Sequence, residues 1–211
     1  MAVRTISTKL AVEGESEYRK SISACNTELS TMKSTLKLVE SEFRGQSNSL
    51  EALTTKGEAL SSMYDKQKEK IATLEAALTN ASSAQEKYSE RISAAKENIE
   101  RCEKSLSELK NSTEDTSEEQ EALTKELDQW NKELSESQAG QVAAARGVNN
   151  WKKQLNNAKV DLNKLSDEVQ QNNTYLKEAQ KSADGAATSI DEYGKKTKEA
   201  GDSIDTLAAT L

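Results

Sequence analysis

The side chains that most often carry out chemistry are scarce in this chain, and their spacing fits no reactive motif. There is no histidine, and the two cysteines, Cys25 and Cys102, are too far apart in the sequence to form a C-x-x-C pair. They therefore indicate neither a disulfide framework nor a metal site. The sequence also lacks the G-x-x-x-x-G-K and G-x-S-x-G patterns of phosphate-binding loops and hydrolases. We predict no catalytic, cofactor-binding or metal-binding residue, no cofactor and no enzyme activity.

Charged side chains are abundant, but their distribution is that of a solvated surface. The chain has 36 acidic and 29 basic residues, for a formal net charge of −7. Lysines alternate with glutamates, and the run "KKTK" at 195–198 is too short to be a nucleic-acid patch. A net acidic surface repels the phosphate backbone, so we predict no stable binding to nucleic acid.

The two tryptophans reveal the repeat that should position all other side chains. Trp130 and Trp151 are 21 residues apart, which is three heptads. With Ile71 at heptad position a and Leu74 at position d, the same phase continues from Tyr18 to the C-terminus without adjustment. Most a and d positions are apolar, although only 34% of the chain is hydrophobic. Such a stripe is what packed helices require, so both tryptophans, at d, are predicted to be packing residues.

Composition agrees with a long helical protein. Ala, Glu, Lys, Leu and Arg make up about half of the chain, and proline is absent. We predict an all-α fold: a long heptad-repeat coiled coil, as an extended rod or a helical hairpin, with a short N-terminal β-strand. Because most insertions shift the phase, few true interruptions are expected, although a hairpin whose loop spans whole heptads stays open.

We divide the chain into five segments. Residues 1–14 form a strand and turn, since apolar and polar residues alternate before Gly14. The other predicted segments are a first coiled-coil segment at 15–110, a hinge or loop at 111–119, a second coiled-coil segment at 120–183, and a Gly/Ala/Ser-rich, weakly helical tail at 184–211.

Polar stripe positions mark three weak points. The strongest is "NSTEDTSEEQ", where Thr116 and Glu119 fit a capping box that would restart a helix. The second lies around Gly140 and Gly147, and the third around "RGQSNS". We interpret these clusters as flexible points more than as layers that fix the helix register.

Three stretches together resemble a known family. They are "ISTKLAVEGESEYRKSISACNTELSTMKSTLKLVESEF", "ALTTKGEALSSMYDKQKEKIATLEAAL" and "WKKQLNNAKVDLNKLSDEV". In this order they are similar to the N-terminal coiled-coil region of tail tape measure (minor tail) proteins from long-tailed phages and prophages of Gram-positive bacteria. The resemblance extends over essentially the whole chain. Family members are typically longer, so this chain is expected to be a fragment, a truncated gene or an excised segment.

The resemblance implies a structural role in virion assembly. Tape measure proteins set the length of the tail tube and occupy its lumen, with tail-tube, tail-tip and tail-assembly chaperone proteins as partners. The expected location is the host cytoplasm during assembly and then the tail lumen. One uninterrupted helix from Tyr18 to Leu211 would be about 290 Å long, and a hairpin half of that. The alternative is a generic bacterial coiled-coil spacer or scaffold, such as the arm of a chromosome-organising or surface protein.

The oligomeric state is not fixed by the pattern. Alanines at d allow close approach of helices, and e and g residues such as Ser82, Ser89 and Asn98 offer little charge pairing. A parallel dimer, a parallel trimer and an antiparallel hairpin all fit. We expect a homo-oligomer, dimer or trimer, in the assembled tail and a fold-back near 111–119 in the isolated chain. No apolar run is long enough for a membrane span or a signal peptide, so a reducing cytoplasm is expected.

Overall fold

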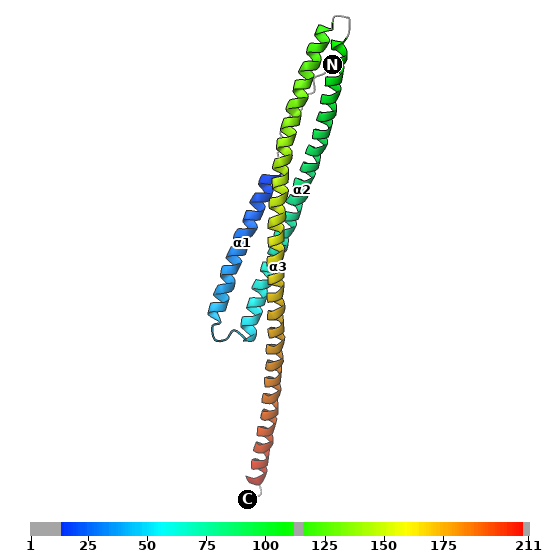
Figure 1. Ribbon diagram of the computed structural model, residues 1–211. Helices are drawn as coiled ribbons and strands as arrows, with labels where there is room; N and C mark the ends of the chain where they lie inside the picture. The colour runs from blue at the N-terminus through cyan, green and yellow to red at the C-terminus, as the bar shows by residue number, and fades with distance from the viewer. Residues whose placement is uncertain (1–13, 112–115, 209–211) are drawn as a thin grey trace. The chain divides into compact units, whose positions relative to one another are not determined.

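The computed structural model consists of three long α-helices: α1 (Glu15–Glu42), α2 (Leu50–Lys110) and α3 (Ser117–Ala208) (Figure 1). The structure describes residues 14–111 and 116–208, with side chains up to residue 192 and at Lys195. All regular secondary structure in these ranges is helical, which confirms the all-α prediction. The predicted N-terminal strand lies, apart from Gly14, outside the described residues.

Local sequence explains where the helices begin and end. The hydroxyl oxygen of Ser49 accepts a hydrogen bond from the backbone N–H of Ala52 at 3.2 Å, which caps the first turn of α2. Acidic residues occupy the first turn of each helix, and Lys110 lies in the last turn of α2. Both placements are favourable for the helix dipole.

The turn between α1 and α2 is a break that the heptad phase did not reveal. Residues 15–110 were predicted as one coiled-coil segment, but α1 ends at Glu42 and α2 begins at Leu50. Gly45 has φ = +90°, a conformation that glycine adopts without steric cost. The non-helical stretch 43–49 is seven residues long. Because this is one full heptad, the chain reverses without changing the phase of the stripe.

The connection between α2 and α3 falls near the strongest predicted weak point. α2 ends at Lys110 and α3 begins at Ser117, while residues 112–115 are outside the described ranges. The Thr116 hydroxyl accepts a hydrogen bond from Gln120 Nε2 at 2.8 Å and donates one to the Leu109 carbonyl at 3.3 Å. Thr116 therefore joins the start of α3 to the end of α2. From Ser117, α3 continues through the predicted segment boundary at 183/184.

The chain divides into two compact units, Met1–Cys25 with Glu69–Lys159, and Asn26–Lys68 with Val160–Leu211. In the first unit α2 and α3 pack antiparallel. Arg91 pairs with Glu133, and Glu75 pairs with Lys159 at 2.9 Å, so residue numbers rise along one helix as they fall along the other. The start of α1 joins them, since the Arg19 guanidinium lies 5.3 Å from the Trp151 ring centroid.

The second unit contains parts of all three helices. Lys56 pairs with Glu40 at 2.8 Å and Lys66 with Glu28 at 2.6 Å, which sets α1 antiparallel to α2. The core holds residues from each helix: Leu60, Met63, Leu165, Met32, Leu36, Tyr64 and Val169. Toward its C-terminal end, α3 continues beyond the turn between α1 and α2 (Figure 1).

Burial follows the predicted stripe closely. Nearly all buried residues occupy a or d, and the d positions are the deepest; the exceptions are Ala52, Met63, Ala77 and Ala84. Trp151 is 2% exposed and Leu155 is buried, while Trp130 is half-buried. The prediction that the tryptophans pack against neighbouring helices is confirmed for Trp151.

Candidate functional site

The two cysteines lie inside the helix packing. Neither forms a disulfide bond, and both are buried at d positions. Burial raises the pKa of the Cys102 thiol, the negative charge of Glu126 raises this pKa further, and Arg101 opposes the shift in part. Because the thiolate is the nucleophilic form, the Cys102 environment disfavours reactivity.

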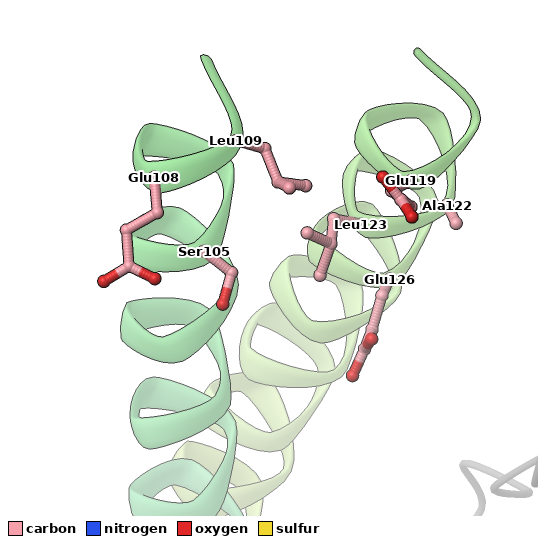
Figure 2. Close-up of a pocket in the computed structure, with 7 residues that line it drawn as sticks. All are labelled: Ser105, Glu108, Leu109, Glu119, Ala122, Leu123 and Glu126. Atoms are coloured by element: carbon pink, nitrogen blue, oxygen red, sulfur yellow. The ribbon is translucent and has the colours of Figure 1, made fainter. Parts of the chain in front are cut away.

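A hollow lies between the end of α2 and the start of α3 in the first unit (Figure 2). Leu109 and Leu123 point toward each other across it, whereas Glu108 points outward. Its other lining residues are Ser105, Glu119, Ala122 and Glu126. One carboxylate oxygen of Glu126 accepts a hydrogen bond from Trp130 Nε1 at 3.2 Å. The charged part of the lining is thus exclusively acidic, which is unsuited to an anionic ligand.

A polar cluster interrupts the apolar packing of α2 against α3 in the first unit. Arg91 Nε donates a hydrogen bond to Glu133 Oε1 at 2.7 Å, and its Nη2 forms an ion pair with the same carboxylate. The Ser137 hydroxyl donates to that oxygen at 3.1 Å. The Arg91 and Glu133 side chains are 20% and 11% exposed, so solvent screens this pair less than a surface pair. Loss of one partner would leave the other charge unpaired at a largely buried position.

The Tyr88 ring lies directly against Gly140 in the same unit. A methyl group at Gly140 would be 2.3 Å from the Cε1 atom of Tyr88, far inside contact distance. The guanidinium of Arg91, from the ion-pair cluster, lies 5.9 Å from the centroid of the same ring. Gly140 was interpreted from the sequence as a flexible point. The structure gives it another role, because the missing side chain is what allows the aromatic ring to pack.

The second unit has its own polar layer. Asn172 is 3% exposed, and its Nδ2 donates to the Leu53 carbonyl at 2.9 Å. Its Oδ1 has no hydrogen-bond partner among the described residues. A methyl group at Gly57 would lie 2.9 Å from Asn172 Nδ2, so the glycine makes room for the amide. Here too, glycine and a polar stripe residue form a specific contact between helices.

Beyond Asn172 the stripe continues along α3 but becomes exposed. Leu176 and Ala179 are half-buried, Ala183 and Ala186 are exposed, and Ile190 is 70% exposed. We call these five residues the tail stripe. Since their heptad phase is that of the buried residues before them, the tail stripe is the candidate interaction surface of the described chain.

The sequence predicted the stripe but missed its polar contacts. Arg91 and Glu133 both occupy position g, and g residues face one another only when helices run antiparallel. Once the antiparallel direction of the helices is known, the opposite charges of these two residues predict that they pair. The heptad phase does not show that the tail stripe is exposed, although its last residues belong to the Gly/Ala/Ser-rich tail predicted at 184–211.

The described residues contain no group of three His, Cys, Asp or Glu side chains placed to hold a metal ion. Within the same ranges, no helix combines the length and the apolar character that crossing a membrane requires. Comparison of the chain with protein-family models, with curated proteins and with solved structures finds no match.

Proposed function

We propose that this chain is a structural phage tail protein, the coiled-coil part of a tape measure that sets tail-tube length and occupies the tube lumen. One observation carries the proposal: the three helices bury mainly the residues of a single stripe that keeps its phase from α1 to α3. A ruler needs a length proportional to residue number. A helix with one continuous packing stripe has that property, at about 1.5 Å per residue.

In this proposal the packed helices form a coiled coil. In such a coiled coil the residues at a and d would interlock between antiparallel helices, and the buried cluster of Tyr88 with Ala144 of the facing helix supports this packing. The same stripe could pack against other copies if the turns opened, because the stretch 43–49 preserves the phase and the chain has no proline. The hairpins then represent the free chain, and longer helices represent the chain inside a tube.

The negative net charge of the chain supports a role in which it lies near DNA without binding it. The chain carries a formal net charge of −7, and its charged residues lie outside the packing stripe. Such a surface lets a genome pass through a tube without binding it. We further propose tail-tube, tail-tip and tail-assembly chaperone proteins as partners, and the host cytoplasm followed by the tail lumen as the location.

The test is a change of length in the phage or prophage that encodes the chain. Deletion of residues 141–168 removes four heptads and keeps the phase, so the tail should shorten by about 42 Å in electron micrographs. As a control, residues 141–168 are replaced with a copy of residues 71–98, which has the same length and heptad phase. This control should leave tail length unchanged. Tails of unaltered length after the deletion would contradict the proposal and favour a spacer role elsewhere in the cell.

A further inference from the structure

Among the described residues, no helix of the second unit covers the apolar face of the C-terminal part of α3. Along α2, Leu53 contacts Asn172 through its carbonyl, and α2 begins three residues earlier, at Leu50. In an antiparallel pair, residues of α3 beyond Leu176 therefore have no residue of α2 opposite them. This explains why Ala186 is exposed while Leu165 and Asn172, which share its heptad position d, are buried.

The tail stripe is continuous with an interface that already exists in the molecule. Leu165 and Val169 pack into the core of the second unit, and the next stripe residues are Asn172, Leu176 and Ala179. No residue is inserted or lost between the packed and exposed stretches. The exposed stretch therefore has the geometry of a helix-packing seam.

Charge is excluded from both sides of this seam. The e and g positions that flank it in residues 173–190 are uncharged: Asn173, Tyr175, Gln180, Ser182, Ala187 and Ser189. The charged residues of the same stretch lie at b, c and f, on the opposite side of the helix: Lys177, Glu178, Lys181 and Asp184. Tyr175, 44% exposed, adds apolar surface at one flank.

We propose that the tail stripe is a self-association surface that binds the same stretch of α3 in a second copy of this chain. In a symmetric antiparallel pair, charged e or g residues would face their own copies and repel. Neutral flanks remove that repulsion. Alanines at 179 and 186 let the two helix backbones approach closely, and Leu176 and Ile190 supply the larger apolar contacts. The inference depends only on the surface of α3 and is independent of the proposed role in a phage tail.

The experiment compares the mass of the full chain with that of two charge-matched variants by sedimentation equilibrium over a range of concentrations. The seam variant is Ala186→Glu with Ile190→Glu. The control variant is Gly185→Glu with Thr188→Glu, which adds the same charge to the same turns at c and f. Gly185 has nothing within 4 Å of an added Cβ, so the control side chain fits.

Wild type and control should have masses above the 23.1 kDa of one chain. The seam variant should raise the dissociation constant on the order of a hundredfold, because pairing would bury its new charges. Circular dichroism should show the same helix content in all three. A wild-type chain that stays monomeric would overturn the proposal and favour a different protein as the partner of the tail stripe. Equal dissociation constants for the seam and control variants would overturn it as well, because association would then use another surface.

Discussion

Two neighbouring stretches of α3 follow the same sequence rule and have different surroundings. Between residues 162 and 172 the stripe residues Leu165 and Asn172 are buried against α2, whereas between 176 and 190 Ala183 and Ile190 are exposed. Heptad phase is identical in the two stretches. The difference shows that a stripe specifies a capacity to pack, while the partner is determined by where the other helices begin and end.

The largest expected effect follows from removing a buried stripe residue. Trp151→Ala should lower the free energy of unfolding by about 3–5 kcal/mol, because it leaves a large cavity and removes the ring beneath Arg19. Ile190→Ala, in the tail stripe, should change it by less than about 0.5 kcal/mol in the monomer. Urea denaturation followed by circular dichroism at low protein concentration measures both. Similar losses for the two variants would contradict the contrast between the stretches.

A smaller effect is expected at the polar cluster. Glu133→Gln removes the charge that Arg91 pairs with at a largely buried site, and should lower the free energy of unfolding by about 1–3 kcal/mol.

The control for this variant is Glu121→Gln, which breaks an ion pair with Lys125 whose side chains are both 70% exposed. That pair lowers the pKa of Glu121, so its contribution is present above the ordinary carboxyl pKa and is lost as pH falls through the folded value. Denaturation at pH 7 should separate the two variants, and a Glu133→Gln protein as stable as wild type would show that the charged pair does not stabilise this packing.

Two glycines of α3 should change the stability of the protein in opposite directions when replaced by alanine. Gly140→Ala should destabilise the protein by about 1–2 kcal/mol, because the new methyl group overlaps Tyr88 and the ring must move. Gly147→Ala meets Ala81 only at 3.9 Å, an ordinary contact, and should stabilise by about 0.5–1 kcal/mol through helix propensity. Thermal melts of the two variants give the comparison. If both substitutions stabilised the protein, Gly140 would not be required for the packing of Tyr88 and would be better described as a flexible point.

The smallest effect concerns the buried thiol. Since burial raises the pKa of Cys102, the unfolded chain loses this proton at lower pH than the folded one. Stability due to this thiol is therefore complete below the ordinary thiol pKa, about 8.5, and declines as pH rises through the folded value. Cys102→Ala in a Cys25→Ala background should remove that decline, as measured by denaturation between pH 7 and pH 10. A decline that persists in the double variant would have to come from other groups.

Much of the fold could be predicted because burial is periodic. The spacing of Trp130, Trp151 and Leu155 was enough to place them at packing positions, and the capping pattern near Thr116 falls where α3 begins. The turn at 43–49 was identified only as a weak point, since a seven-residue loop leaves no trace in the phase. Helix direction is equally invisible to a heptad count.

The contacts between helices needed coordinates for a different reason. Gly140 was interpreted as a flexible point, because the sequence does not show that Tyr88 occupies the space it leaves. Nor does the sequence show that Gly57 makes room for Asn172. The pairing of Arg91 with Glu133 depends on two residues 42 positions apart, which only the antiparallel arrangement brings together. The tail stripe is the reverse case, where the pattern was visible but its exposure was not.

Amide hydrogen exchange along α3, measured at several protein concentrations, tests the difference between the packed and the exposed stretch most directly. We predict strong protection of residues 162–172 at every concentration, because their stripe packs within one chain. Residues 176–190 should exchange rapidly at low concentration and become protected as concentration rises, because their partner is a second copy. Equal protection of both stretches at all concentrations, or rapid exchange of residues 176–190 that no concentration slows, would contradict this account.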